Sequence, residues 1–575
     1  MAQETPKPSP DAAPQSPADE IARSASESTL ALNPIVGVRG QDLLAAGAGV
    51  MRVMASQPQM MAKAWMGFAA EMGDIMLGRS ERTPARGDRR FADKGWQESG
   101  VPKALMQTYL AWAEDVTATV EKLDLPDRDA ARARLVTSIF VDAMAPSNNA
   151  FVNPAAVRKF YETGGKSAVD GLRNLIGDAV QHGGLPSSVD RSKFKVGENL
   201  AVTPGTVVFR NEVLELIHYT ATTPQVRRRP LFVVPPQINK YYSIDMSPGK
   251  SMIEFLLAHG LQPYCVSWRN PTARQREWDL QTYVEALDEA CDAAREITGA
   301  DSVNIMGSCS GGITLAAYAG WLAARKKSEK INAVILAVCV LNTQAKTDSD
   351  FAALVSPGSI QAAKKASAAR GVLDGEEMAK MFAWMRPNDL IWNYWVNNYL
   401  LGNAPPAFDV LYWNADTTRL PQGLHHDFLD MIYSNPFMTP GALEIGGHAI
   451  DMSQVNHDAY VIAGTTDHIT PWKAVYETAR LFGPDTQFIL SNSGHLQSLL
   501  NPPGNPKSWY VKGLAGAPDP DAWAETGVKH EGTWWLDWAE HLTARSGDLV
   551  DAPEAPGGTR FPPLGPAPGT YVFEP

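Results

Sequence analysis

The amino-acid sequence predicts an α/β fold in which a mostly parallel sheet forms a large C-terminal domain, preceded by a mainly helical N-terminal domain. Apolar residues recur at helical spacing through the first third of the chain, as in the run from Met60 to Met72. After Val196, short β-branched runs alternate with helical patterns, which is typical of βαβ units and a parallel sheet. A chain of 575 residues exceeds one core of ordinary size, so two structural units are expected.

Changes in composition divide the chain further. Residues 1–33 are rich in Ala, Pro and Ser and are expected to form a disordered tail. The helical N-terminal domain covers 34–190, and the α/β domain covers 191–546. Residues 547–575, rich in Pro and Gly, are expected to be a C-terminal tail. At about 341–440 the alternation breaks into an aromatic-rich stretch, which we interpret as an inserted lid (cap) over the sheet.

Within the α/β domain the apolar runs predict individual strands. Two runs separated by a short turn, Thr206–Arg210 and Val213–Tyr219, predict an antiparallel hairpin that leads into the sheet. A helix around Trp534 to Trp538 is expected to dock near the end of the domain. The buried strands expected after the hairpin are Leu231–Val234, Tyr264–Trp268, Val303–Met306, Ala333–Val340, Tyr460–Ala463 and Phe488–Leu490.

Charge and composition exclude several classes of function. A formal net charge of -12 argues against general affinity for nucleic acid or an anionic membrane. The longest apolar run, Ile331–Leu341, is shorter than the ~20 residues that span a bilayer, so no transmembrane segment is expected. Residues 1–20 lack a basic start and an apolar stretch, and the four cysteines show no metal-binding spacing. We therefore expect a cytoplasmic protein with no metal and no cofactor.

The strongest chemical signal is a strand, a tight turn and a helix in direct succession. The strand Val303–Met306 leads into Gly-Ser-Cys-Ser-Gly, and a helix follows from Ile313. Glycines two positions before and after Cys309 let strand and helix backbones converge, which indicates the nucleophile elbow of an α/β-hydrolase fold with Cys in place of Ser. The helix dipole there favours the thiolate form of the cysteine.

An acid and a base follow the elbow in the order that this fold requires. Asp467 comes after the predicted strand Tyr460–Ala463, and His495 comes after Phe488–Leu490. Nucleophile, acid and histidine in that order are typical of α/β-hydrolases. We therefore predict that Cys309, Asp467 and His495 are catalytic.

The oxyanion hole of this fold uses two backbone N–H groups. One follows the nucleophile and belongs to Ser310. The other comes from the loop after the strand Leu231–Val234, where two prolines lack an N–H, so the donor is Gln237 or Ile238. We favour Ile238.

Other residues near these motifs have competing interpretations. Ser310 also has small neighbours, but the glycines centre on Cys309. His468 could act as the base, yet it abuts Asp467, so a structural or surface role is the expectation. The pair His425-His426 with Asp427 could suggest a metal, but no further ligands have suitable spacing, and we interpret it as polar lid surface.

The remaining cysteines have simpler interpretations. Cys265 and Cys339 lie within apolar strand patterns, and Cys291 lies within a predicted helix. Cysteine is among the most frequently buried residue types, so all three are expected to be packing residues.

Further motifs extend beyond these catalytic candidates, and together they resemble the polyhydroxyalkanoate synthases over most of residues 85 to 545. The Gly-x-Cys-x-Gly-Gly pattern and the Gln after the double proline resemble the class II, medium-chain-length branch more than class I. The motifs are PPQINKYY from Pro235, SWRNP from Ser267, GSCSGG from Gly307, RPNDL from Arg386, FDVLYWN from Phe408 and GHLQS from Gly494.

The resemblance implies an acyltransferase that polymerises (R)-3-hydroxyacyl-CoA into polyester and releases CoA. Cys309 would be the acylated nucleophile, His495 the base, and Asp467 a carboxylate acting on His495 or on the substrate hydroxyl. It also implies a homodimer with a lid that opens, at the surface of polyester granules in the cytoplasm. A thioesterase or depolymerase of the same fold, and a non-catalytic granule-associated protein, are the alternatives.

Overall fold

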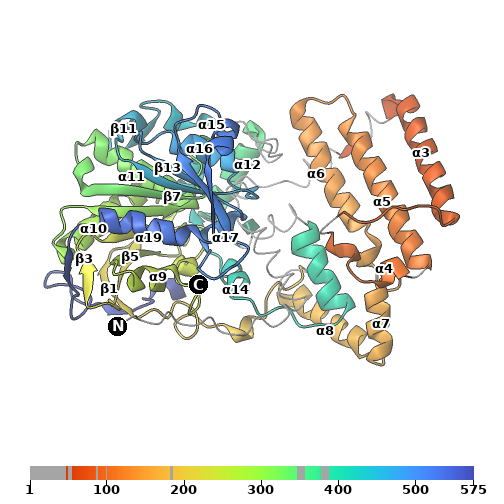
Figure 1. The fold of residues 1–575 in the computed structure, drawn as a ribbon, viewed down its shortest axis with the longest axis horizontal. Helices are drawn as coiled ribbons and strands as arrows, with labels where there is room; N and C mark the ends of the chain where they lie inside the picture. Colours follow the sequence, from red (N-terminus) through yellow and green to blue (C-terminus); the bar gives the residue numbers. More distant parts are fainter. Residues whose placement is uncertain are drawn as a thin grey trace.

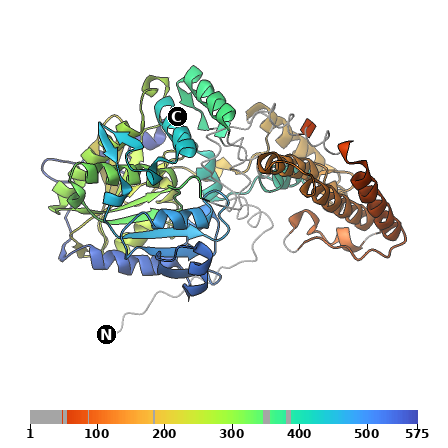
Figure 2. The ribbon, with the colours of Figure 1, turned by 90° about the horizontal axis from the view of Figure 1, so that it is seen from above.

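The computed structural model describes residues 47–48, 55–85, 88–98, 100–181, 185–345, 356–375, 377–378 and 387–575. The predicted tail at 1–33 lies outside this part of the chain. An α/β domain and a group of helices that extends from one side of it are visible in both views (Figures 1 and 2). Among the described residues, no helix has the length and apolar character to cross a membrane.

The N-terminal region is helical, as predicted. Asn153 shows how one of these helices begins, because its side chain accepts hydrogen bonds from the backbone N–H groups of Ala155 and Ala156. A small core around Phe91, Trp96 and Tyr109 holds part of the region together. The main helices are α3 (Pro58–Met76), α4 (Gly95–Glu98), α5 (Gly100–Glu121), α6 (Asp127–Ala143), α7 (Pro154–Glu162) and α8 (Lys166–Gln181).

An 11-stranded sheet forms the centre of the α/β domain, in the order β15-β14-β13-β12-β7-β6-β4-β5-β2-β1-β17. Its six middle strands are parallel and buried, because helices cover both faces of the sheet (Figure 2). They are β4 (Leu231–Val234), β5 (Pro263–Trp268), β6 (Val303–Ser308), β7 (Ile331–Ala337), β12 (Ala459–Gly464) and β13 (Gln487–Ser491).

Both the predicted hairpin and the six predicted buried strands are confirmed. The hairpin consists of β1 (Gly205–Arg210) and β2 (Leu214–Tyr219), which pair antiparallel at one side of the sheet. Two strands were not predicted from the sequence: β14 (Trp509–Leu514), which pairs antiparallel with β13, and β15 (Val528–Glu531), which pairs antiparallel with β14. Because β15 is largely exposed, it lacks the apolar run that identifies a buried strand.

The expectation that 547–575 forms a tail is wrong. Strand β16 (Leu549–Asp551) pairs with β3 (Gln225–Arg227), and β17 (Gly565–Pro566) pairs with β1. Tyr571 and Val572 are buried. Composition alone misleads here, because Pro and Gly mark irregular backbone without saying whether it packs.

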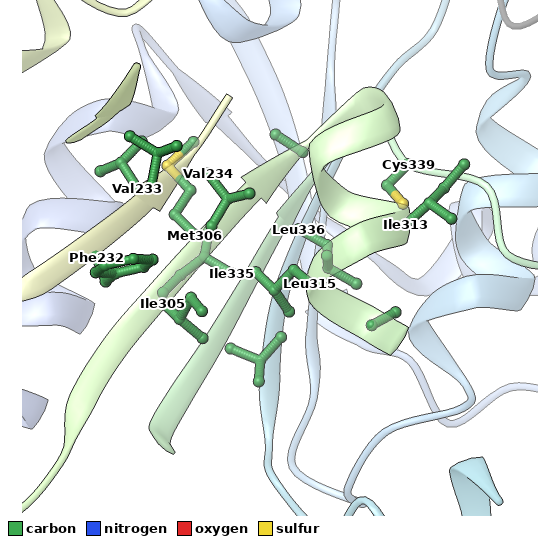
Figure 3. Close-up of a cluster of buried hydrophobic side chains, with 14 of the residues drawn as sticks. Phe232, Val233, Val234, Ile305, Met306, Ile313, Leu315, Ile335, Leu336 and Cys339 are labelled. Carbon is green, nitrogen blue, oxygen red and sulfur yellow. The ribbon is translucent and has the colours of Figure 1, made fainter. Parts of the chain in front are cut away.

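Helix α11 (Cys309–Ala324) lies in the middle of the domain core. Its residues from Cys309 to Ala323 are all buried, and Figure 3 shows Leu315 beside Leu336 and Ile335 of β7. Cys339 also packs here, with its sulfur next to α11. The predicted helix near the end of the domain is α19 (Trp534–Arg545), whose tryptophans at 534, 535 and 538 are buried.

The predicted insertion lies between β7 and β12, neighbours in the sheet. It contains the helices α12 (Pro357–Arg370), α14 (Asp409–Ala415) and α15 (Gln422–Ser434), and the π-helical turns η9 (Asn388–Trp392) and η10 (Trp395–Leu400). Helix α8 of the N-terminal region packs against η10.

The interpretation of His425 as polar lid surface is wrong. His425 lies on the buried face of α15, and its Nδ1 is 2.8 Å from Ser367 Oγ. His426, the next residue, is half-buried. Adjacent helical residues point in different directions, so a sequence pair does not share one environment.

Candidate active site

Cys309 stands where strand β6 meets helix α11. The strand ends at Ser308 and the helix begins at Cys309, whose φ is 50°. Positive φ is uncommon for a residue other than glycine, and such strained positions cluster at functional sites. The predicted sharp turn is therefore present at this cysteine.

Close backbone contacts explain the glycines on either side. A Cβ on Gly307 would lie 2.8 Å from the Cα of Gly312. A Cβ on Gly311 would overlap the carbonyl oxygens of Val234 and Pro235, in and just after β4. Neither position has room for a side chain, so the elbow requires glycine at both.

His495 and Asp467 form a buried pair. The Nδ1 of His495 lies 2.8 Å from Oδ2 of Asp467, and both residues are buried. Asp467 follows β12 and His495 begins α17 (His495–Leu499) just after β13, so the parallel strands deliver both to one end of the sheet.

Thr470, which the sequence analysis missed, completes the surroundings of the carboxylate. Its hydroxyl donates to Asp467 Oδ2 over 2.6 Å and lies 3.1 Å from His495 Nδ1. The backbone N–H groups of Ile469 and Thr470 donate to Oδ1 over 2.9 and 3.0 Å. A Thr three residues after an Asp in a turn is a local signal that could have identified it.

These contacts shift the pKa values of both partners. Burial by itself lowers the pKa of His495, but the Asp467 carboxylate and then Cys309 raise it to about 10. Burial by itself raises the pKa of Asp467. The opposing effects of His495 and Thr470 are together larger, so the pKa of this carboxyl falls below its usual value. The pair therefore favours an imidazolium beside a carboxylate.

Cys309 and His495 line the same small cavity. Its volume is about 20 Å³, which is room for a water molecule and not for an acyl chain. Trp413 of α14 and Leu496 are also in its wall. An acyl substrate can reach Cys309 only if the surrounding side chains, including the inserted region, move.

Of the two candidate oxyanion donors in the loop after β4, one lies in the wall of this cavity. The backbone N–H of Gln237 donates to Ser310 Oγ over 3.1 Å, whereas Ile238 lines the cavity. Ser310 is fully buried and its hydroxyl holds the loop, which argues against it as the nucleophile. That Ile238 and Ser310 supply the oxyanion N–H groups stays a prediction.

The inserted region hydrogen-bonds the same loop at successive carbonyl groups. Thr418 donates its hydroxyl to Gln237 O over 2.6 Å and its backbone N–H to Ile238 O over 3.2 Å. Trp413 donates its Nε1–H to Lys240 O over 2.7 Å. The sequence analysis missed both residues, because such long-range contacts leave no local pattern.

Other candidate residues lie outside this arrangement. His468 is half-buried and is not in the cavity wall. Cys265, Cys291 and Cys339 are buried and free, as predicted, and burial raises the pKa of the Cys291 thiol to about 12. Within the described residues, no group of three or more His, Cys, Asp or Glu side chains is placed to hold a metal ion.

The sheet, the elbow and the histidine–aspartate pair together define a protein of the α/β-hydrolase fold. A family model described as alpha/beta hydrolase fold matches residues 230–502. A second model, described as the N-terminus of poly-beta-hydroxybutyrate polymerase (PhaC), matches residues 87–256.

Curated relatives match nearly the whole chain. Poly(3-hydroxyalkanoate) polymerase 1 of Ectopseudomonas oleovorans is 50% identical over 97% of this chain and 99% of the relative. Polymerase 2 of the same organism is 47% identical, over 94% and 96%. The polymerase subunit PhaC of Cupriavidus necator is 35% identical, over 93% and 91%. The chain belongs to the poly(3-hydroxyalkanoate) polymerase family and is an acyltransferase, as the resemblance predicted.

Proposed function

We propose that this chain polymerises (R)-3-hydroxyacyl-CoA thioesters into a polyester through an acyl intermediate on Cys309, with release of CoA. One observation carries the proposal: Cys309, at a strained elbow, lines the same enclosed cavity as a histidine that is hydrogen-bonded to a buried carboxylate. The relatives are poly(3-hydroxyalkanoate) polymerases, which supports a polyester as the product.

In the first step the proton of Cys309 already resides on His495, which is the imidazolium that its raised pKa favours, and the Sγ thiolate attacks the thioester carbonyl carbon. The N–H groups of Ser310 and Ile238 stabilise the tetrahedral oxyanion. Collapse of the intermediate breaks the bond to the CoA sulfur, which leaves as a thiol with the proton from His495. A thioester is exchanged for a thioester, so the acyl-enzyme keeps enough driving force to form an ester.

In the elongation step the neutral His495 removes the proton from the 3-hydroxyl of one acyl unit, and that oxygen attacks the thioester carbonyl of another. The new ester forms as the carbon–sulfur bond of that thioester breaks, and the sulfur leaves as a thiol with the proton from His495. The carboxylate of Asp467 already accepts hydrogen bonds from His495, Thr470 and Ile469. This favours a role for Asp467 as the partner of His495 over direct action on the hydroxyl.

Exclusion of water supports transfer over hydrolysis. The cavity beside Cys309 is small and its wall is largely apolar, so bulk water reaches the cysteine only through the same movement that admits an acyl chain. The thioesterase or depolymerase alternative requires water to enter together with the substrate. The non-catalytic alternative gives no reason for the strained Cys309 beside the His495–Asp467 pair.

Release of CoA and analysis of the product test the proposal. Purified wild-type protein is expected to release CoA and form insoluble polyester from a 3-hydroxyacyl-CoA, and Cys309→Ala is expected to do neither. Cys291→Ala, a buried cysteine outside the cavity, is the matched control. Free hydroxy acid without polymer would favour a thioesterase, and turnover by Cys309→Ala would exclude this mechanism.

The family resemblance also implies a homodimer and a position at the surface of cytoplasmic polyester granules. We include both in the proposal. Light scattering of the purified chain tests the dimer, and sedimentation of the protein with its newly made polymer tests the surface.

A further inference from the structure

The last residues of the chain run across the edge of the sheet toward the active site. The backbone N–H groups of Thr570 and Tyr571 donate to the fully buried carboxylate of Glu215 on β2, over 2.8 and 3.0 Å. The Tyr571 hydroxyl donates to Asn211 O over 2.7 Å. These bonds anchor the segment that continues through Val572 and Phe573 to Glu574 and Pro575.

Lys240, the last residue of the loop Gln237–Lys240, meets this segment with a buried ammonium group. The side chain is 4% exposed, and its Nζ donates to the backbone carbonyl of Glu574 over 2.6 Å. Burial lowers the pKa of Lys240; Asp416 and Glu574 oppose this effect, and Arg419 adds to it. A buried ammonium without this acceptor would carry a desolvation cost, so the bond constrains both ends.

Two arginines hold the other side of the segment. Arg269 Nε lies 3.0 Å from the Glu574 carboxylate, and its guanidinium carbon is 4.7 Å from the centre of the Tyr571 ring. Arg419, which follows the lid residue Thr418, donates to Pro575 O. Glu574 and Pro575 therefore connect the loop Gln237–Lys240 to the end of β5 and to the inserted region.

The rest of the loop is held by helix α11 and by the inserted region. Ser310 and Thr314 of α11 hold the N–H and the side-chain amide of Gln237. Thr418 and Trp413 of the inserted region hold carbonyl groups of the loop, and Asn239 donates its side-chain amide to the carbonyls of Trp413 and Asn414. When the inserted region moves to admit substrate, its hydrogen bonds to the loop can break. The bond between Lys240 and Glu574 does not itself include a group of the inserted region, and Glu574 is held by Arg269, just after β5.

We propose that the Glu574 carbonyl and the Lys240 ammonium form a clamp that positions the loop Gln237–Lys240, and with it the N–H of Ile238, for stabilisation of the oxyanion. The inference rests on the proposed function. Neither residue is in the wall of the cavity, so both act as positioning residues. A displacement of such a donor by about 1 Å is enough to cost up to about 100-fold in rate.

Two variants break the clamp from opposite sides. Lys240→Met keeps the length of the side chain and removes the ammonium, and deletion of residues 574 and 575 removes the carbonyl. Each is expected to lower kcat for CoA release about 10- to 100-fold with little change in KM. Glu574→Ala keeps the backbone carbonyl but removes the carboxylate that Arg269 binds, so its loss of kcat is expected to be smaller than that of the deletion.

Lys330→Met is the matched control for the loss of a buried ammonium. Lys330 is 7% exposed, and its Nζ bonds Asp288 and Asp292 over 2.6 and 2.8 Å, away from the cavity. This variant is expected to lower the melting temperature and to keep the kcat of its folded fraction. If Lys240→Met does not fold, the deletion variant carries the same test.

Alkylation of Cys309 by iodoacetamide separates a positioning role from a general disturbance. This displacement has no tetrahedral oxyanion, so its rate is expected to stay within about twofold of wild type while kcat falls. The double variant, Lys240→Met with the deletion, is expected to lose no more than either single change, because both remove one interaction.

A parallel loss of kcat and alkylation rate, additive effects in the double variant, or an unchanged kcat in Lys240→Met would each overturn the clamp. A different result would contradict the proposed function itself. In that case the wild type itself releases no CoA, or Cys309→Ala remains active.

Discussion

Helices α11 and α8 illustrate two ways in which this chain uses a helix. Every residue of α11 from Cys309 to Ala323 is buried, so strands and helices contact it on all sides. On α8 the apolar side chains face outward, and Leu172, Ile176 and Val180 are 57%, 56% and 81% exposed. One helix is held by the packing of its whole surface, and the other by a few contacts.

Those few contacts of α8 go mainly to the inserted region. Asn174 Nδ2 donates to the backbone carbonyls of Asn398 and Asn403, each over 2.9 Å. Trp395 of η10 donates to Asn148 O over 3.1 Å. The nucleophile therefore begins a helix that is buried on all sides. The inserted region, which must move, contacts the N-terminal helices through these polar groups.

The sharpest test of this contrast compares one substitution in each helix. Gly311→Ala is expected to abolish activity, because its Cβ would overlap the carbonyl oxygens of Val234 and Pro235, and neither backbone can yield. Gly177→Ala in α8 meets no atom within 4 Å and is expected to stabilise the helix by up to about 1 kcal/mol. Activity and thermal unfolding of both purified proteins measure the difference.

The contrast fails if Gly311→Ala retains more than a tenth of wild-type activity. It fails equally if Gly177→Ala is the more damaging change. Circular dichroism distinguishes a folded but inactive Gly311→Ala from a protein that has not folded.

The buried pair provides the next largest effect. Asp467→Asn keeps the shape of the side chain and removes the charge that holds His495 in orientation, so kcat is expected to fall about 10³- to 10⁴-fold. Asp458→Asn, just before β12 and so at the opposite end of that strand from Asp467, is the control and is expected to stay near wild type. A loss of less than tenfold in Asp467→Asn would contradict the assigned role.

The same pair makes stability depend on pH with a definite sign. The pKa of His495 is raised to about 10 in the folded protein, above the ordinary value of about 6.5 that it takes on unfolding. Its stabilising contribution is therefore complete below about pH 6.5 and disappears as the pH rises through about 10. The difference in unfolding free energy between wild type and Asp467→Asn, measured from pH 6 to 10, is expected to shrink. A constant difference would contradict this assignment.

Local patterns predicted the rigid part of the molecule well. The elbow at Cys309 is visible because strand, glycines and helix are contiguous, and Asp467 and His495 each follow a strand that is buried and therefore apolar. The placement of those strands side by side in a parallel sheet follows from the βαβ pattern.

Contacts between distant segments could not be predicted in this way. The hydrogen bond from Lys240 to Glu574 joins residues 334 positions apart, and the Pro- and Gly-rich segment before Glu574 has no apolar period. Thr418 lies in a lid whose local sequence gives no register against the loop after β4. His425 shows the same limit, because a polar residue on a buried helix face looks like surface when its neighbours are unknown.

The N-terminal helices are expected to unfold separately from the sheet. Trp96 of α4 is 1% exposed beside Phe91, so Trp96→Ala is expected to destabilise this cluster by about 3–5 kcal/mol. Trp65→Ala removes a side chain that is 67% exposed and is expected to change stability by less than about 0.5 kcal/mol. Hydrogen exchange is expected to rise in α4 and α5 of Trp96→Ala and to stay slow in β6 and β7. A matching rise in β6 would show that the two regions unfold together.

The smallest expected effect concerns the join between α8 and the inserted region. Asn174→Ala removes both bonds from Nδ2 to the carbonyls of Asn398 and Asn403, which should weaken this contact by about 1–2 kcal/mol. Arg173→Ala, at an adjacent side chain that is 77% exposed, is the control. The amides of residues 398–403 are expected to exchange faster in Asn174→Ala alone, with kcat changed less than about threefold, because the elbow on α11 is held independently. A large loss of kcat without faster exchange would mean that α8 acts on the active site by a route other than this contact, and the separation drawn between the two helices would be wrong.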